Sequence, residues 1–186
     1  MAKSRSGRLI YQLKVTLEGT EPSVWRRFLV PVDYTIEKLH RVLQIVMGWE
    51  DAHLHEFKAG KLSYGEPHPD YDFKMLNHKK ATVQGVAPRV GSKFTYIYDF
   101  GDGWQHELKV EKILDAEKGV HYPLCAAGDR ACPPENCGGI WGFAELLEAL
   151  ENPKTDEQRE LVEWVGDYEP TAFDLDKVNK RLKRMK

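Results

Sequence analysis

The segment Asp99-Phe-Gly-Asp-Gly-Trp-Gln-His106 concentrates groups that can bind a cation or move protons. Asp99 and Asp102 bracket a glycine-rich turn, and His106 follows four residues after the second carboxylate. Carboxylates are ligands for divalent cations, and imidazole is a common acid–base group near neutral pH. The structural alternative is that the carboxylates bond to the backbone of their own turn, while His106 is a satisfied core histidine near Trp104.

An imidazole pair, His53-x-His55, lies upstream of this segment. In a strand, side chains two residues apart share a face, so both rings can reach one metal ion. Two histidines in a sheet are more often structural or exposed, so the pair indicates a site only together with other ligands. A hydrolytic site would use Glu135 as its base and bind an ion through His53, His55, Asp99, Asp102 and His106.

The three cysteines, Cys125, Cys132 and Cys137, lie within thirteen residues. An odd number of thiols in a chain without a secretion signal indicates free thiols or metal ligands. One interpretation is a structural zinc ion held by the three thiolates and His106, although the spacing differs from that of common zinc ribbons. His53, His55 and His121 are the alternative fourth ligands. The other interpretations are small buried thiols in a tight loop, or a nucleophilic Cys–His pair.

The chain ends in a basic segment with Lys177, Lys180, Arg181, Lys183, Arg184 and Lys186. These side chains can contact the phosphates of a nucleic acid. More often such a run is a solvated face, and it also suits the C-terminus of a helix, which carries partial negative charge. Nucleic-acid contact through this helix is therefore an alternative prediction, as is an unknown protein partner.

Hydrophobic alternation predicts the sheet that positions these groups. It indicates strands over 9–17, 24–30 and 53–57 and a hairpin over 93–114. The hairpin turns at Gly101-Asp-Gly103, and its first strand is expected to place four aromatic residues on one face: Phe94, Tyr96, Tyr98 and Phe100. Arg26 and Arg27 must point to opposite faces, so one guanidinium can look inward.

Helix signals complete the expected architecture. The clearest helix begins after the N-cap Thr35 and ends at Gly48. Residues 65–91 and 115–142 are rich in Gly and Pro and predict irregular chain. Three helices follow, over about 142–151, 156–165 and from 174 onward. We expect an α+β domain with a mixed or mainly antiparallel sheet, one helix between early strands and three C-terminal helices.

Length and composition indicate one globular domain. The chain has 186 residues, of which 41% are hydrophobic and 30% charged, and a net charge of −2. No apolar run approaches the ~20 residues of a membrane span, and the basic start lacks the core of a signal peptide. We therefore expect a cytoplasmic location without membrane association, and a disordered arm (1–8) before a single domain (9–186). Gly-rich phosphate loops are absent, so no nucleotide cofactor is expected.

Several linked motifs follow one another along the chain: Val24-Trp-Arg-Arg27, Leu39-His40, Met47-Gly-Trp49, His53-Leu-His-Glu-Phe57, Tyr98–His106, Cys132-Pro-Pro-Glu-Asn-Cys-Gly-Gly139 and Asn179-Lys-Arg-Leu182. Together they resemble the root-inducing-plasmid (pRi) ORF-three-like family, often labelled transposon-resolvase-associated. The resemblance covers nearly the whole chain after residue 8. It implies a compact α+β domain that occurs on plasmids and mobile elements, and it implies no particular reaction.

We therefore favour a non-catalytic binding or scaffold module associated with plasmid or mobile-element genes. Its sheet face and cysteine loop would form the interaction site, with zinc joining the loop to His106. Trp104 would pack beneath the hairpin turn that Asp99 and Asp102 fix. The first alternative is a metal-dependent hydrolase acting on nucleic acid or another phosphoester. The second is a DNA-contacting accessory protein of a mobile element.

Overall fold

One eight-stranded sheet forms the centre of the computed structural model, which describes residues 7–67 and 75–185. The strand order is β5-β4-β3-β6-β7-β1-β2-β8, and all neighbours are antiparallel except β4 and β5. The strands are β1 (Leu9–Leu17), β2 (Trp25–Pro31), β3 (His55–Ala59), β4 (Leu62–Gly65), β5 (Leu76–Asn77), β6 (Lys93–Tyr98), β7 (Trp104–Asp115) and β8 (Leu124–Asp129).

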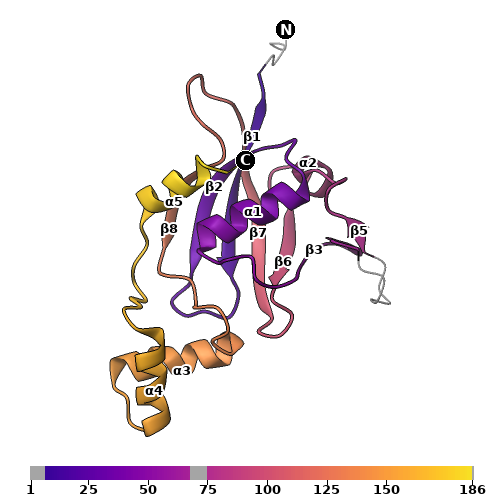
Figure 1. Ribbon diagram of the computed structural model, residues 1–186. Helices are drawn as coiled ribbons and strands as arrows, with labels where there is room; N and C mark the ends of the chain where they lie inside the picture. Colours follow the sequence, from indigo (N-terminus) through magenta and orange to yellow (C-terminus); the bar gives the residue numbers. More distant parts are fainter. Residues whose placement is uncertain (1–6, 68–74, 186) are drawn as a thin grey trace.

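The helices are α1 (Ile36–Met47), α2 (Val83–Val86), α3 (Gly139–Glu151), α4 (Asp156–Val165) and α5 (Leu175–Leu182). Helix α1 lies across one face of the sheet, and α5 lies beside it over β8 (Figure 1). The α+β class with a mainly antiparallel sheet is confirmed, as are the three C-terminal helices. The arm expected over 1–8 falls largely on residues 1–6, outside the described residues. Within the described ranges, every helix is too short or too polar to cross a membrane.

Helix α1 forms where the capping residues predict it. The Thr35 hydroxyl accepts a hydrogen bond from the Lys38 N–H at 3.2 Å, which satisfies one free donor of the first turn. Gly48 ends the helix at φ 107°, a left-handed conformation that glycine adopts without strain. The helix buries an apolar stripe against the inner face of the sheet: Ile36, Leu39, Val42, Leu43 and Val46.

Arg26 is the guanidinium that looks inward. Only 2% of the residue is exposed, whereas Arg27 on the next position faces the other side of the sheet. The buried guanidinium stacks on Phe173 at 4.2 Å from the ring centre. It donates to four backbone carbonyls, those of Val46, Trp25, Asp129 and Arg130, at 2.7–2.8 Å. Arg26 therefore joins the C-terminal turn of α1 to the end of β8.

The structure corrects three expectations about the chain between elements. Residues 65–91, predicted to be irregular, contain strand β5 and helix α2. Residues 115–142, predicted to be irregular, contain strand β8 with Cys125 in it. The small residues of Leu124–Asp129 have little β propensity, and the strand forms because its backbone pairs with β2. Phe100 does not continue the inner aromatic row, because the chain leaves the sheet at Asp99, whose φ is 56°. The Phe100 side chain is consequently 42% exposed.

Candidate metal centre

A cavity of about 550 Å³ lies beside the first half of α1, next to the segment that leads into β3. Four histidines line it: His40, His53, His55 and His78. Charged residues at the rim are paired, since Arg41 contacts Glu37 at 3.0 Å and Lys79 contacts Glu66 at 3.3 Å. The rim has no strong net charge, so the imidazoles dominate the chemistry of the cavity.

His40 is held on both sides of its ring. It lies on the buried stripe of α1, with only 3% of the residue exposed. Nδ1 lies 2.8 Å from the Tyr96 hydroxyl, and Nε2 lies 2.6 Å from an Asp51 oxygen. Gln44, one turn along the helix, donates to the same Tyr96 hydroxyl at 2.9 Å. The helix and strand β6 together fix the orientation of the ring.

Asp51 reaches His40 because the chain reverses direction after the glycine that ends α1. Its φ is 58°, in the left-handed region that Asp tolerates better than most residues. The Asp51 N–H donates to the side-chain oxygen of Gln44 at 2.8 Å, and this contact anchors the reversal. The carboxylate then lies against His40, with 55% of the side chain exposed to the cavity mouth.

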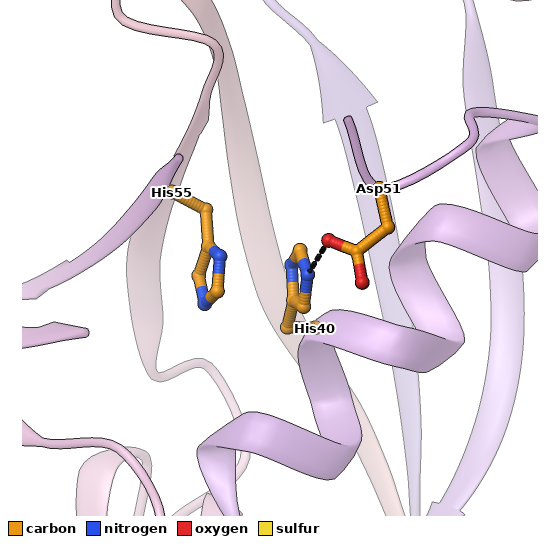
Figure 2. A group of neighbouring side chains, drawn as sticks. All are labelled: His40, Asp51 and His55. Atoms are coloured by element: carbon orange, nitrogen blue, oxygen red, sulfur yellow. Dashed lines mark hydrogen bonds and ion pairs between the residues drawn. The ribbon is translucent and has the colours of Figure 1, made fainter. Parts of the chain in front are cut away.

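His55 completes a compact group with these two residues. It opens β3, and its ring stacks on His40 with centroids 3.5 Å apart and planes 8° from parallel (Figure 2). Its Nε2 lies 3.1 Å from Nδ1 of His78, whose own Nε2 is buried without a hydrogen-bond partner in the described part of the chain. Ligand atoms from His40, Asp51 and His55 all lie within 4.8 Å of one another.

Both stacked imidazoles are neutral near pH 7. Burial, and then the charge of the nearby His78 ring, lower the pKa of His40 to about 3. Burial, and then the His40 ring, lower the pKa of His55 to about 3. The Asp51 carboxylate raises the pKa of His55 and offsets only part of this effect. A metal ion binds an unprotonated imidazole nitrogen, so an ion at His40 would have to replace the proton that Nε2 donates to the Asp51 carboxylate.

Two nitrogens and one oxygen fit the donor preferences of zinc. Catalytic zinc sites use three protein ligands and keep a fourth position open, and an ion held by His40, Asp51 and His55 would leave such a position for a ligand. Tyr96 would then orient His40 from the opposite side of the ring, as hydrogen-bond partners of metal-binding histidines commonly do. The Asp51 oxygen and the His40 Nε2 are 2.6 Å apart, so an ion between them would have to replace this hydrogen bond.

Comparison with known proteins agrees with the fold and the motifs. Residues 9–177 match the plasmid pRiA4b ORF-3-like protein family. The chain belongs to this family. Uncharacterized protein y4hQ of Sinorhizobium fredii is 37% identical over 176 residues, which span 93% of this chain and 90% of y4hQ. The crystal structure of a protein of unknown function, MM3350 from Methanosarcina mazei Go1, has a TM-score of 0.83 at 38% identity and matches 92% of this chain and 98% of MM3350.

The ORF-3-like chain also brings together three of the residues singled out in its sequence. His53 Nε2 lies 3.5 Å from an Asp99 oxygen and 3.7 Å from a Glu135 oxygen. This nitrogen and the facing Glu135 oxygen are buried and have no hydrogen-bond partner in residues 7–67 and 75–185. The other Glu135 oxygen accepts from the Tyr98 hydroxyl and the Glu50 N–H, each at 3.0 Å. His53 therefore lies between two carboxylates on the wall of the cavity.

His53 and His55 do not converge on one ion position. His53 precedes β3 and turns toward Asp99 and Glu135, whereas His55 turns toward His40 and His78. The rule that alternate residues share a face requires a regular strand, and β3 begins only at His55.

Asp102, Trp104 and His106 of the hairpin do not line the cavity, and Asp99 also bonds to its own turn. One Asp99 oxygen accepts from the Gly101 N–H at 2.9 Å, the turn bonding expected of Asp in this position. His106 is fully buried, its Nδ1 lies 3.1 Å from the Tyr96 carbonyl, and burial lowers its pKa to about 4. Trp104 is also fully buried, with its ring near Trp49. Asp102 lies near Cys137 instead, at the start of α3.

The cysteines are buried or half-buried free thiols. The Cys125 Sγ lies 3.5 Å from the Arg27 carbonyl and 3.6 Å from that of Ala127. Burial raises the pKa of Cys125 to about 11, and burial together with the Asp102 carboxylate raises the pKa of Cys137 to about 12. Among the described residues, Cys125, Cys132, Cys137 and His106 do not form a group with three ligand atoms within 4.8 Å. Zinc in this loop stays a prediction.

Sequence reasoning missed His40, Asp51 and His78. A signal for His40 was available, because it follows Leu39 and precedes Leu43 on the helix, and therefore falls on the buried stripe. A histidine in that stripe must find polar partners inside the protein. Asp51 and His78 lie in turns whose course depends on contacts distant in sequence, so their spacing alone gave no indication.

Proposed function

We propose that this protein is a binding module with a divalent metal ion of the zinc class at the centre of its histidine-rich cavity. His40, Asp51 and His55 would hold the ion, and the open position would accept an oxygen or nitrogen atom of a small ligand. The observation that carries the proposal is the convergence of three ligand atoms within 4.8 Å, two of them on neutral imidazoles.

Two further properties of the cavity support the proposal. Its volume of about 550 Å³ lies within the range of small-molecule sites, which commonly enclose ~300–1,000 Å³. The unpartnered Nε2 of His78 lies behind His55 and offers a further polar atom to an ion or its ligand. A buried nitrogen without a partner costs free energy, and a bound ion or ligand is one way to recover it.

Metal binding can be measured directly by titrating zinc into protein stripped with a chelator, with calorimetry as the readout. We expect one ion per chain at neutral pH. His55→Phe keeps a stacked ring but removes the nitrogen ligands, and Asp51→Asn removes the charged oxygen, so each should weaken zinc binding at least about tenfold. His121→Ala is the matched control, because His121 is exposed and outside the cavity.

The same titration separates the cavity from the cysteine loop. Cys132→Ser should leave binding at the cavity unchanged. If zinc is lost from Cys132→Ser and retained by His55→Phe, the loop holds the metal and the cavity proposal is wrong. Two ions per chain, each lost with one of these variants, would place metal in both regions.

Metal-dependent hydrolysis is the second candidate, because His53 lies on the wall of the same cavity between Asp99 and Glu135. A zinc-bound water is acidic enough to act as a nucleophile near neutral pH, and His53 would transfer its proton. A chromogenic phosphodiester tests this reaction with the zinc-loaded protein. His53→Ala should lower turnover by about 100-fold or more while leaving zinc affinity unchanged. Absence of turnover in the zinc-loaded wild type would leave the non-catalytic binding module.

A further inference from the structure

Four cations lie in one row across the outer face of the sheet, opposite the face that α1 covers. Lys93 of β6 pairs with Lys109 of β7, Lys109 pairs with Lys14 of β1, and Lys14 pairs with Arg27 of β2. Neighbouring strands are about 4.8 Å apart, so the row extends over roughly 14 Å. Like charges directly opposite one another destabilise a sheet, so this arrangement opposes folding stability.

Acidic residues offset only part of this charge. Glu107 contacts Lys93 at 2.7 Å, and Glu111 contacts Arg27 at 2.6 Å. Lys14 and Lys109 have no ion-pair partner among the described residues. A shallow depression of about 650 Å³ adjoins the row and adds Lys112 to its lining. The outer face therefore presents a local positive strip on a chain whose net charge is −2.

An aromatic ring lies at one end of the strip. Trp25 is partly exposed at the start of β2, with the Lys14 Nζ at 5.0 Å and the Arg27 guanidinium carbon at 5.3 Å from its ring. Both cations lie over the indole ring, so a base that stacks there would displace a cation toward the adjoining phosphates. A flat strip on a sheet face suits a single strand, whose bases are free to turn toward it.

We propose that this outer face binds single-stranded nucleic acid, with the phosphates along Lys93, Lys109, Lys14 and Arg27 and a base on Trp25. The site is separate from the histidine-rich cavity and does not depend on metal there. It is also separate from the basic residues of α5, a helix that packs beside α1 on the other face of the sheet. The α5 cations consequently provide a matched control of equal charge.

Fluorescence anisotropy of a labelled twelve-nucleotide oligothymidylate, over a series of salt concentrations, tests the proposal on the full chain. The triple variant Lys14→Gln, Lys93→Gln, Lys109→Gln should bind at least tenfold more weakly than wild type. Its slope of log affinity against log salt should fall by about 2, at roughly 0.7 per lost phosphate contact. The control triple variant Lys177→Gln, Lys180→Gln, Lys183→Gln should change affinity less than twofold.

Trp25 supplies an independent readout. Trp25→Phe should weaken binding at least about fivefold, because base stacking on an aromatic ring contributes ~1–3 kcal/mol. The oligonucleotide should quench tryptophan fluorescence in wild type, and this quenching should be smaller in Trp25→Phe. The triple lysine variant of the sheet and Trp25→Phe change only outward-facing side chains. Their circular dichroism spectra should therefore match that of wild type.

Several outcomes would overturn the proposal. The first is absence of binding by wild type in 20 mM salt. The second is an equal loss of affinity in the α5 control. The third is tighter binding to a duplex of the same length. The fourth is displacement of the oligonucleotide by polyglutamate at equal charge concentration, because the face would then recognise charge alone. Binding of oligouridylate in place of oligothymidylate supports the proposal, since the phosphodiester chemistry is shared.

Discussion

His40 and His55 stack face to face, with ring centroids 3.5 Å apart and planes 8° from parallel. Two protonated rings at this distance would repel each other strongly, and burial keeps both neutral, with pKa values of about 3. The stack thus holds two neutral imidazoles beside the Asp51 carboxylate, with the His40 Nε2–H donating to it at 2.6 Å. Because an imidazole nitrogen binds a metal in the plane of its ring, an ion held by both histidines would require one ring to turn out of this stack.

The first prediction concerns the thermal stability of the cavity. At a zinc concentration 100 times the Kd, wild type should gain about 2.7 kcal/mol in free energy of unfolding. His55→Phe should keep most of the metal-free stability, since a phenyl ring can occupy the stack on His40, and should lose this gain. Differential scanning calorimetry with and without zinc measures both effects. A zinc-dependent rise in Tm that persists in His55→Phe would contradict the assignment of this ligand.

The second prediction concerns the buried Arg26. Arg26→Met leaves four backbone carbonyls without their donor, and each buried unpaired carbonyl costs about 1–3 kcal/mol unless water reaches it. We expect the free energy of unfolding to fall by at least about 3 kcal/mol in urea denaturation. The neighbouring Arg27→Met is the matched control and should cost about 1 kcal/mol. Equal costs for the two variants would show that the inward guanidinium stabilises the fold no more than the outward one does.

The third prediction follows from the row of cations on the sheet. Lys109→Glu places a carboxylate between Lys93 and Lys14, so it replaces two unfavourable pairs with two favourable ones. The free energy of unfolding should rise by about 1 kcal/mol at low salt, and the gain should shrink in 0.5 M NaCl. Lys118→Glu, an exposed loop substitution with the same charge change, should have no comparable effect. If both variants behave alike, net charge and not the row explains the result.

The fourth prediction is a pH dependence that arises from Glu111. Hydrogen bonds from Arg27 lower its pKa to about 2, and the side chain is 20% exposed. Because the folded pKa lies below the unfolded value of about 4.5, the unfolded state takes up the proton more readily as pH falls from 4.5 to 2. The stabilisation, about 1–2 kcal/mol after solvent screening, is full above pH 5 and is lost in acid. Glu111→Gln should be less stable than wild type at pH 7, with the difference closing near pH 2.

The fifth prediction concerns thiol reactivity. Burial raises the pKa of Cys125 to about 11 and of Cys137 to about 12, so almost no thiolate exists at pH 8. Alkylation by iodoacetamide should be slow in the native protein and fast in denaturant, as mass spectrometry can record. Fast modification of a single native cysteine would instead indicate an activated nucleophile.

Local signals in the sequence were sufficient for most of the fold. Thr35 and Gly48 mark both ends of α1, and the alternation around Gly101–Gly103 marks the central hairpin. The sequence did not predict strand β8, because its residues have weak strand preference and its pairing with β2 spans almost a hundred residues of chain. Long-range pairing of this kind leaves little trace in a local pattern.

The candidate site was only partly accessible from sequence for the same reason. Asp99 and Glu135 were recognised as acidic groups, but their meeting with His53 depends on the Tyr98 and Glu50 contacts that fix Glu135. The grouping of His40 with Asp51 and His55 depends on the reversal of the chain after α1. Residue type predicted which side chains can do chemistry, and tertiary contacts decided which of them meet.

Strand β8 lies at the edge of the sheet, where unpaired backbone groups invite pairing with a second molecule. Asn179 of α5 donates to the Cys125 carbonyl at 2.9 Å and accepts from the Cys125 N–H at 2.8 Å. Its amide imitates the peptide group of a further strand, and α5 therefore acts as a cap on this edge. The opposite edge, β5, is only two residues long. Both ends of the sheet thus discourage edge-to-edge aggregation, at one end through a single asparagine.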